Sequence, residues 1–459
     1  MQNLPGQIDT QQTLFFTDSA LPPVKGKKVA IDFRGGNVSS DAGALILSEI
    51  ETQTGIIQKL TDCISDSRRS YSIRHSLQEL LLQRTLQICC GYEDTNDSNT
   101  LRKDPILKLA VGRLPDEGDH LASQPTFSRT ENRIRRKELV LMARAIVDHF
   151  IVSYPRQPEV IVLDFDDTDD PVHGHQQLAL FNAYYQEHCY QPLHVYEGLS
   201  GKLITTILRP GKRPKGIEIV AYLKRIVEQI RKHWPDTIIV FRGDSHYSSP
   251  AVFTYITGQK NMFSVTGLTT NQKLQKIVQS LVNQVKGKPA GTRRYHSFSY
   301  QAGSWSRPRR IVAKVEMTEK GLNVRFVSTD MHQAKARVLY EEIYCARGND
   351  ELYIKDHKTY TKSDRTSCHR FQANQFRLFL HSAAYILLHT LRSEVLRGTH
   401  LARATFDTIR LKLMKVGARV IELKTRIKVH LPTSYPYQRI FAKSLNMLAY
   451  LRGQPPPAN

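Results

Sequence analysis

The sequence predicts an α/β protein, in which helices flank a mixed sheet and a mainly β insertion interrupts the core. Two short apolar runs that end in acids, Val160–Phe165 and Thr237–Phe241, are typical of buried strands that stop at a cleft. Between them, Ile217–Trp234 has apolar residues at helical spacing. The 107 positions that separate Asp244 from Glu351 are too many for a loop and predict an inserted subdomain.

The charge of the chain points to a polyanionic partner. A net charge of +22 exceeds what solubility requires and is typical of proteins that bind nucleic acid. From Ser245 to Val315 there are eleven Lys and Arg residues and no Asp or Glu, and from Arg397 to Arg452 twelve basic residues face two acids. The acids gather around residues 159–170 instead. A basic body around an acidic focus suits a metal-dependent enzyme that acts on nucleic acid.

Five segments follow from these patterns. Apolar residues recur at helical spacing over Ala44–Leu60 and Ile73–Cys90, and Ser128 and Glu131 have the spacing of a capping box that opens a further helix. Alternating apolar residues predict strands near Tyr295–Tyr300 and in the two segments after it. The expected segments are a helical DNA-binding domain at 1–155, a core at 156–270 and 331–396, a mainly β insertion at 271–330, and a basic helical region at 397–459.

Membrane and secreted classes are disfavoured. No run of about 18 apolar residues is present, so we expect no membrane span. The first residues lack a charged segment followed by an apolar core, so we expect no secretory signal. The six cysteines show neither a CxxC pair nor metal-ligand spacing, which favours reduced thiols in the cytosol.

A cluster of carboxylates, DFDDTDD, follows the first predicted strand. On a strand, Asp164 and Asp166 face one way and Asp167 faces the other. Neighbouring carboxylates raise one another's pKa unless a cation neutralises them, and Mg²⁺ or Mn²⁺ suits such oxygen ligands. With Asp244 and Glu351, the chain offers three carboxylates for two metal ions that act in phosphoryl transfer. A polar turn that caps a helix would explain the same acids.

The stretch YCARGNDELYIKDHK, which begins at Tyr344, contains four residues at helical spacing: one phenol, one acid and two cations. On a continuous helix Tyr344, Arg347, Glu351 and Lys358 would lie within about a 60° arc of one face. Such a face suits a site that holds a metal and a phosphate, whereas a solvated face with ion pairs is the simpler explanation. The Gly-Asn pair inside the stretch weakens a helix and predicts a bend there.

A phosphatase is the alternative from another class of enzyme. Asp164, Asp166 and Thr168 match the D-x-D-x-T motif of haloacid-dehalogenase-type phosphatases, in which the first Asp is the nucleophile and the second is the acid. Those enzymes carry a second acidic pair after a late strand, but FRGDSHY supplies only one acid. They also have no use for a large basic excess, so this reading ranks below the nucleic-acid enzyme.

Taken together, the motifs resemble one family. Tyr344, Arg347, Glu351 and Lys358 match at every spacing the Y-x2-R-x3-E-x6-K signature of a subgroup of the DDE transposases of bacterial insertion sequences, within the retroviral-integrase superfamily. The motifs LDFDDTDDPVHG, FRGDSHY, GYEDTNDSNTLRKDP, SQPTFSRTEN and DRTSCHRFQANQFRL also look like that subgroup. The resemblance covers about residues 30–450, and the combination is specific where any single motif is weak.

The resemblance implies an RNase H-like core with a catalytic, metal-binding triad of Asp166, Asp244 and Glu351, which would hold two Mg²⁺ or Mn²⁺ ions. Asp164 and Asp167 remain open as the first ligand, and Asp166 is preferred because it fits the D-x-T form of the motif. The DNA contacts expected on this basis are Tyr344, Arg347 and Lys358 near the cut, and Trp305, Arg309 and Arg310 in the insertion. Trp305 would stack a flipped base, with packing on the insertion sheet as its structural alternative.

The implied function is that of a transposase. It would bind terminal inverted repeats in double-stranded DNA, cleave them by metal-activated water and join the freed 3′-OH to target DNA. Two protomers would form the synaptic complex, in the bacterial cytosol and at the nucleoid. A DNA-binding protein of transposase descent that no longer cuts DNA is a third reading of the same motifs.

Overall fold

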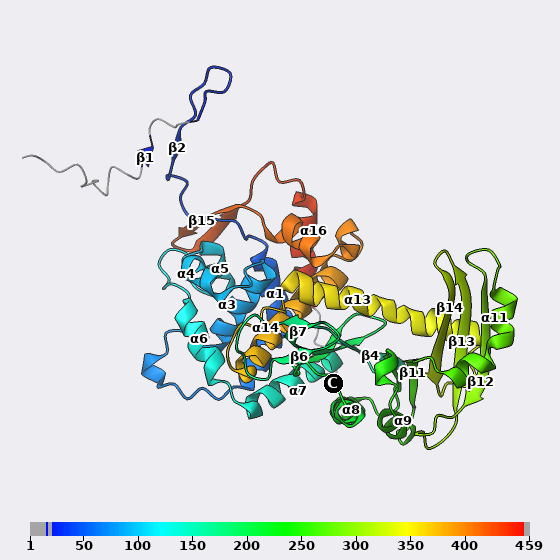
Figure 1. The fold of residues 1–459 in the computed structure, drawn as a ribbon. Coiled ribbons are helices and arrows are strands. Elements are labelled where there is room, and N and C mark those ends of the chain that lie inside the picture. The colour runs from blue at the N-terminus through cyan, green and yellow to red at the C-terminus, as the bar shows by residue number, and fades with distance from the viewer. Residues whose placement is uncertain (1–14, 17–20, 454–459) are drawn as a thin grey trace, which may run out of the picture.

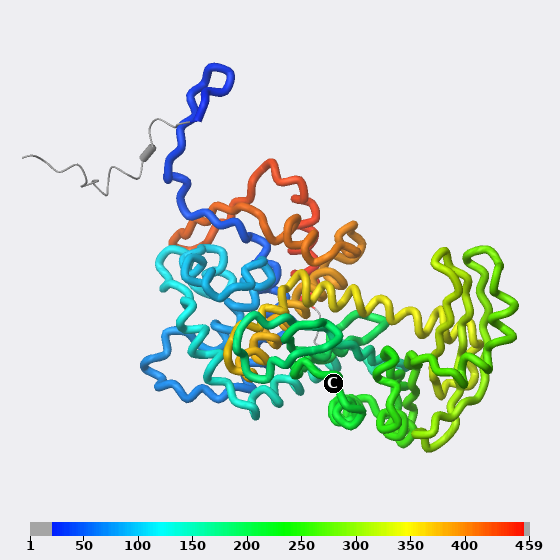
Figure 2. The backbone as a smooth tube through the Cα atoms, viewed as in Figure 1, coloured from blue at the N-terminus to red at the C-terminus, as the bar shows by residue number. Residues whose placement is uncertain are grey.

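A sheet of eight strands runs through one half of the molecule, and helices from both ends of the chain form the other half (Figure 1). The computed structural model describes residues 15–16 and 21–453. Among these residues, no helix is long and apolar enough to cross a membrane. The path of the chain in Figure 2 shows the strands of the insertion at one end and the helical half at the other, with a helix near residue 350 running between them.

The central sheet has the strand order β12-β13-β14-β11-β10-β4-β8-β9. Its strands are β4 (Val160–Asp167), β8 (Leu193–Glu197), β9 (Leu203–Ile207), β10 (Ile238–Gly243), β11 (Met262–Leu268), β12 (Arg293–Tyr300), β13 (Arg309–Thr318) and β14 (Gly321–Thr329). Strands β4, β10 and β11 are parallel, and the other neighbours pair antiparallel. The carboxyl ends of β4 and β10 therefore meet at one edge, as the sequence predicted for the two runs that end in acids.

The strands expected in the insertion are confirmed, but they do not form a sheet of their own. Strand β14 pairs with β11 of the core, with Val265 opposite Thr329 and Leu268 opposite Phe326. The expected boundary at residue 270 thus falls within one continuous sheet. Alternating apolar residues could locate these strands but not the neighbour with which they pair.

Helices α8 (Gly216–His233) and α9 (Pro250–Thr257) pack on the core strands. Leu163 and Phe165 of β4 share one buried cluster with Ile219 and Leu223 of α8 and with Val252 of α9. This cluster, which also includes Ile239 and Phe241 of β10, fixes the positions of the two strands at whose carboxyl ends the acids lie. The helix expected at Ile217–Trp234 is confirmed within a residue or two. Two short helices, α10 (Gln272–Ile277) and α11 (Gln279–Val285), belong to the insertion.

The N-terminal helices do not form a core by themselves. They are α1 (Ala44–Thr54), α2 (Ile56–Asp62), α3 (Leu77–Cys89), α4 (Ser98–Leu101), α5 (Pro105–Ala110), α6 (Gln124–Arg133) and α7 (Arg136–Val152). They share one hydrophobic cluster with α14 (Phe371–Thr390), α15 (Phe406–Ile409) and α16 (Gln438–Arg452). Seventeen residues of α14, from Ala373 to His389, are buried, so this helix is the centre of the helical half.

The predicted capping box at Ser128 and Glu131 is wrong, because both residues lie inside α6. That helix begins after Ser123, with Pro125 in its first turn, where proline's missing N–H costs nothing. The next helix, α7, starts at Arg136, and Glu138 accepts a hydrogen bond from the Arg135 backbone N–H at 2.7 Å.

The C-terminal region is not purely helical, which corrects that expectation. Strands β15 (Ala418–Leu423) and β16 (Arg426–His430) form a hairpin whose first strand also pairs with β3 (Val38–Ser39). The alternating apolar residues of ARVIEL and RIKVH explain the hairpin, because one side of each strand packs on the helical core. The remaining strands are β1 (Phe15–Phe16), β2 (Ile31–Asp32), β5 (Asp170–Pro171), β6 (Leu180–Asn182) and β7 (Glu187–Tyr190).

Candidate active site

Two acids lie where parallel strands end. Asp166 is near the end of β4, and Asp244 follows the last residue of β10. The register places Arg242 of β10 opposite Asp164 of β4 and Gly243 opposite Phe165, so both acids stand at one edge of the sheet. Asp244 also begins the turn after the strand, because its carboxylate accepts a hydrogen bond from the His246 backbone N–H at 2.9 Å.

Asp164 is occupied by a buried ion pair. Its carboxylate accepts hydrogen bonds from Nε and Nη2 of Arg242, and both side chains are fully buried, with relative exposures of 0% and 1%. A Cβ atom at Gly198 would collide with this pair, so glycine permits the close approach of the loop after β8. The Asp164 carboxylate is therefore part of the framework, and it has no exposed oxygen to act as a nucleophile.

Arg347 reaches the acidic edge from another part of the chain. Its Nη2 donates to Oδ2 of Asp166 at 2.8 Å. Burial, Asp167 and Asp244 together raise the pKa of Asp166 to about 6, although Arg347 opposes the shift. Burial lowers the pKa of Arg347, but the nearby Asp166 and Asp244 more than offset it. Burial and like charges thus destabilise the ionised form of Asp166, and a bound cation would stabilise that form.

His246 joins two of the acids and was not among the residues predicted from the sequence. Its Nδ1 lies 3.0 Å from Oδ1 of Asp244, and its Nε2 lies 2.9 Å from Oδ1 of Asp167. Burial alone would lower its pKa, but these two carboxylates raise the pKa of His246 to about 9. Burial raises the pKa of Asp244, and the bonds from His246 reverse that shift and leave it lowered. The only sequence signal was the position of the histidine two residues after Asp244.

The stretch from Tyr344 to Lys358 is not one regular helix. After α12 (Ala336–Val338) come a π-helical segment (Leu339–Tyr344), a 3₁₀ turn (Cys345–Arg347), α13 (Gly348–Lys355) and a second π-helical segment (Asp356–Tyr360). The Gly-Asn pair, where a bend was predicted, stands in the first turn of α13, and Arg347 and Gly348 keep right-handed helical backbone angles. Irregular turns of this kind are frequent at functional sites, because they aim side chains that a regular helix would separate.

Three of the four signature residues reach the acidic edge or its loop. Besides Arg347, Lys358 Nζ donates to Oγ1 of Thr168 at 3.2 Å and to Oδ1 of Asp169 at 3.0 Å. Tyr344 packs on β11, where a Cβ atom at Gly267 would lie 2.7 Å from its hydroxyl oxygen. These three side chains therefore surround the ends of β4, β10 and β11.

Glu351 behaves differently from its neighbour Asp350. In the described part of the chain, the exposed Glu351 makes no hydrogen bond or ion pair. Asp350 is fully buried at 0% exposure, and neither of its carboxylate oxygens has a hydrogen-bond partner within residues 21–453. Burial, with Asp164 and Asp166 nearby, raises the pKa of Asp350 well above its ordinary value. The structure thus brings Asp166 and Asp244 together but leaves Glu351 in solvent.

A polar cavity of about 510 Å³ opens beside Asp244. Its lining residues come from β11, β14 and the helical segments before α13, and they are Asp244, Ser245, Gly267, Leu268, Thr269, Thr270, Arg325, Phe326, Tyr340, Tyr344 and Arg347. Two arginines, hydroxyl groups and aromatic rings around one carboxylate can accommodate a charged group of a substrate next to the acids.

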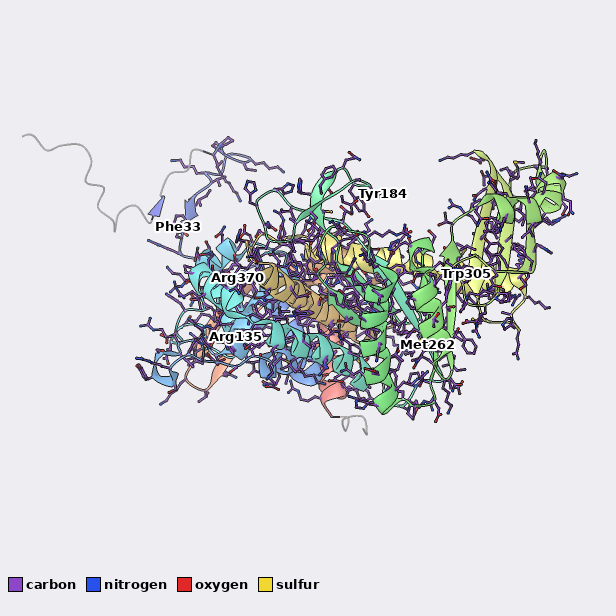
Figure 3. All side chains as sticks on the ribbon, turned by 60° about the horizontal axis from the view of Figure 1, so that its bottom comes forward. Phe33, Arg135, Tyr184, Met262, Trp305 and Arg370 are labelled. Carbon is purple, nitrogen blue, oxygen red and sulfur yellow. The ribbon has the colours of Figure 1, made fainter. Side chains whose placement is uncertain are left out.

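Of the three residues proposed in the insertion, Trp305 and Arg309 are buried and Arg310 is half-buried. Trp305, labelled in Figure 3, is 8% exposed and packs edge-to-face on Phe253 and Tyr300. Arg309 is 4% exposed and lies 3.2 Å from Oδ2 of Asp330, with its guanidinium over the Phe253 ring. Arg310 donates to the backbone carbonyl groups of residues 331, 332 and 334. This packing fits the alternative role of Trp305, which is to pack on the insertion sheet rather than to stack a base. Arg309 and Arg310 use their hydrogen-bond donors within the protein.

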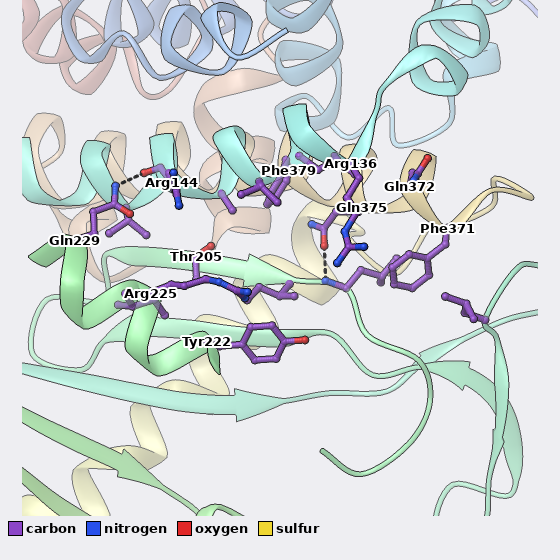
Figure 4. A pocket seen from close by; sticks show the side chains of 18 residues that line it. Arg136, Arg144, Thr205, Tyr222, Arg225, Gln229, Phe371, Gln372, Gln375 and Phe379 are labelled. Atoms are coloured by element: carbon purple, nitrogen blue, oxygen red, sulfur yellow. Dashed lines mark hydrogen bonds between the residues drawn. The ribbon is translucent and has the colours of Figure 1, made fainter. Parts of the chain in front are cut away.

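A separate cavity of about 640 Å³ lies between α7, α8, β9 and the start of α14 (Figure 4). Its lining is mostly apolar, with Arg136, Arg144 and Arg225 among the residues around it and no acid. Gln375 accepts a hydrogen bond from the Leu208 backbone at 2.7 Å, and Gln229 donates to the Arg144 carbonyl at 2.8 Å. Without a carboxylate or a nucleophile, this cavity has no part in the chemistry of the acidic edge.

Three comparisons with known proteins bear on this chain. The structure is similar to a piggyBac transposase in a synaptic complex with hairpin DNA, at a TM-score of 0.42 and 10% sequence identity, over 83% of this chain and 82% of that one. Comparison with curated proteins gives no match. The family model described as Transposase DDE domain group 1 matches residues 21–453, nearly the whole chain. The chain therefore belongs to the group 1 family of DDE transposases.

Proposed function

We propose that this chain binds the terminal inverted repeats of an insertion sequence, cleaves the DNA there and joins the freed 3′-OH to target DNA. The proposal rests mainly on the meeting of Asp166 and Asp244 at the ends of β4 and β10, with Arg347 and Lys358 beside them. Acids on adjacent strands suit metal ions, and the cations beside them suit phosphates. The strand order β9-β8-β4-β10-β11 agrees with the RNase H-like core expected from the resemblance.

The donor set fits hard divalent cations. Asp166 and Asp244 offer carboxylate oxygens. Burial and, after it, the like charges of Asp167 and Asp244 raise the pKa of Asp166, and a bound cation would offset both effects. Among the described residues no three His, Cys, Asp or Glu side chains already converge to hold a metal, so Glu351 must turn in from solvent to complete the triad. When bound, two Mg²⁺ or Mn²⁺ ions would activate the attacking oxygen and stabilise the leaving oxygen.

Arg347 and Tyr344 would hold DNA phosphates next to the acids, and Lys358 would support them by fixing the loop after β4. Arg347 uses one nitrogen on Asp166, while its buried Nε has no hydrogen-bond partner in the described structure and is free to donate to a phosphate. Lys358 holds the loop of Thr168 and Asp169 in place. Tyr344 lines the cavity beside Asp244, where its hydroxyl group can donate to a phosphate oxygen.

His246 would keep the acids in position while DNA binds. With its pKa at about 9, the imidazole is protonated at neutral pH and forms ion pairs with both Asp244 and Asp167. This arrangement holds the Asp244 carboxylate ionised and fixes its direction. We infer that two protomers act together on the two transposon ends, in the cytosol and at the nucleoid.

The phosphatase alternative loses its nucleophile, because Asp164 is buried against Arg242. The third reading is a protein of transposase descent that binds DNA without cutting it. One assay distinguishes all three readings. Purified protein is incubated with Mg²⁺ and either a labelled transposon end or a small phosphomonoester. We expect strand cleavage of the labelled end. Hydrolysis of the phosphomonoester alone would restore the phosphatase, and binding without any product would identify an inactive relative.

A further inference from the structure

A second cationic site lies in the helical half of the molecule. A cavity of about 350 Å³ is formed by the start of α6, the segment before α3 and the end of α4. Its lining residues are Arg68, Ser72, Arg74, His75, Arg102, Leu121, Ser123, Thr126, Arg129, Thr130 and Arg133. Five arginines and a histidine thus surround one hollow, with no Asp or Glu among the lining residues. We call this hollow the arginine cavity.

Nearby acids neutralise only part of this charge. Asp66 pairs with Arg68 and, at 3.7 Å, with Arg133. Glu79 pairs with His75 and with Arg113, which lies outside the cavity lining. The side chains of Arg74, Arg102 and Arg129 form no ion pair within the described chain. Three arginines of the lining therefore lack an acidic partner among the described residues.

One of these guanidinium groups has an unused donor inside the protein. The Nε atom of Arg102 is buried and lacks a hydrogen-bond partner among the described residues. Buried polar atoms are nearly always paired, so an unpaired one at a cavity indicates a missing partner that accepts hydrogen bonds. Arg84 shows the contrast, because its buried guanidinium donates to the backbone carbonyl groups of Tyr92 and Glu93.

The start of α6 adds hydroxyl groups rather than free backbone donors. Gln124 N–H already donates to Asn99 at 3.1 Å, and Pro125 has no N–H. The Ser123 side chain makes no capping hydrogen bond, so its hydroxyl group is available. The binding capacity of this site therefore comes from guanidinium groups and hydroxyl groups, a combination that matches the oxygens of a phosphate.

We propose that the arginine cavity binds a phosphate group of the DNA backbone, at a site separate from the acidic edge of the sheet. Arg74, Arg102 and Arg129 would supply the charge, and Ser123 would supply a hydroxyl group. The identity of the partner as DNA rests on the proposed function, whereas the phosphate chemistry rests on the cavity alone. Free phosphate or a nucleotide presents the same oxygens, and the experiment separates these sources.

The test compares two double variants of the full chain. Arg74→Gln with Arg129→Gln removes two exposed cations from the cavity, and Arg144→Gln with Arg225→Gln removes two exposed cations elsewhere, with the same change in net charge. Affinity for a labelled duplex is measured from low to moderate NaCl concentration. We expect the cavity variant to lose about tenfold in affinity and about one unit in the slope of log K against log salt, and the control to change little.

Equal slopes and affinities for the cavity variant and the control would overturn the proposal. A third variant, Arg102→Lys, retains the charge but loses the planar donor group, and it should weaken binding with melting unchanged. A shift in the melting temperature of the wild type by inorganic phosphate, without any difference between the two double variants on DNA, would assign the site to a free anion and overturn its role in DNA binding. Because only binding is read, the result does not depend on whether the protein cuts DNA.

Discussion

The acidic edge and the insertion belong to one sheet, yet they use arginine in different ways. At the acidic edge, Arg347 pairs with Asp166 and retains an unpaired Nε beside a polar cavity. In the insertion, Arg309 is enclosed between Asp330 and the Phe253 ring. Arg309 comes from an acid-free basic stretch and Arg347 from a segment of mixed charge, and both were predicted to contact DNA. The comparison shows that burial and partners, rather than local charge, distinguish an arginine that can bind phosphate from one that holds the fold.

The largest expected effect concerns the two strand-end acids. Asp166→Ala or Asp244→Ala should reduce DNA cleavage with Mg²⁺ by more than about 100-fold, because loss even of groups that only orient metal ligands costs 10- to 100-fold. Binding to the transposon end should persist. Cleavage of labelled DNA and a binding titration measure the two properties. Asp236→Ala, which removes an exposed acid near the start of β10, is the control.

Undiminished cleavage by Asp244→Ala in the presence of Mg²⁺ would show that the acidic edge takes no part in DNA cleavage. Equal losses in Asp236→Ala would show instead that any acid near β10 affects the assay.

The neighbouring acids of α13 give a sharper form of the same test. Glu351→Gln should reduce cleavage as strongly as Asp244→Ala if Glu351 turns in to complete the triad. Asp350→Asn should leave cleavage close to that of the wild type, because burial beside Asp164 and Asp166 raises the Asp350 pKa and so favours the protonated form of its carboxyl group. Asparagine has the shape of that protonated acid. The reverse pattern, with Asp350→Asn inactive and Glu351→Gln active, would make Asp350 the third ligand.

In the insertion, removal of a buried arginine should change the free energy of unfolding rather than DNA binding. Arg309→Ala leaves Asp330 without its partner in a largely buried site and should lower the free energy of unfolding by about 3–5 kcal/mol, the usual cost of breaking a buried ion pair. Urea titration measures the change, with the exposed Arg294→Ala as control. At temperatures where the variant remains folded, affinity for DNA should be unchanged. A loss of affinity for DNA without a change in the free energy of unfolding would show that Arg309 contacts DNA.

The sequence alone located much of the core and of the candidate site, for identifiable physical reasons. The run before Asp166 and the helix of α8 follow simple hydrophobic periods, and β4 and α8 confirm them. The spacing of the signature predicted that Arg347 and Lys358 lie near the acids. In the structure Arg347 pairs with Asp166 of β4, and Lys358 pairs with Asp169 in the loop after β4. Their roles in catalysis stay predictions until they are tested.

The features that the sequence did not reveal depend on contacts distant in the chain. The pairing of β14 with β11 merges the insertion with the core, and α14 gathers helices from both ends of the chain into one cluster. The local periodicity of the sequence does not determine which strand pairs with β14 or which helices pack on α14. The buried position of Arg309 and the bridge formed by His246 are likewise set by side chains that meet only in the folded protein.

A smaller effect is expected in the pH dependence of metal binding at the acidic edge. The metal-free Asp166 has a pKa raised to about 6 by burial and neighbouring acids, so its proton must leave before a cation binds. Affinity for Mn²⁺ should be constant above pH 6 and should fall by up to about tenfold for each pH unit below it. Calorimetric titration at several pH values measures this. Affinity that stays constant down to pH 4.5 would mean that Asp166 is not the ligand whose proton competes.

The smallest expected effect concerns Trp305. Trp305→Phe keeps an aromatic ring against Phe253 and Tyr300 but reduces its area, so the free energy of unfolding should fall by about 1 kcal/mol. Cleavage and strand transfer should remain at wild-type levels, because the enclosed ring has little surface on which a base could stack. Thermal melting and a single-turnover cleavage assay measure the two quantities. Unchanged melting with slower processing of the DNA end would mean that the ring leaves the core when DNA binds, and the insertion would then resemble the acidic edge in serving the substrate directly.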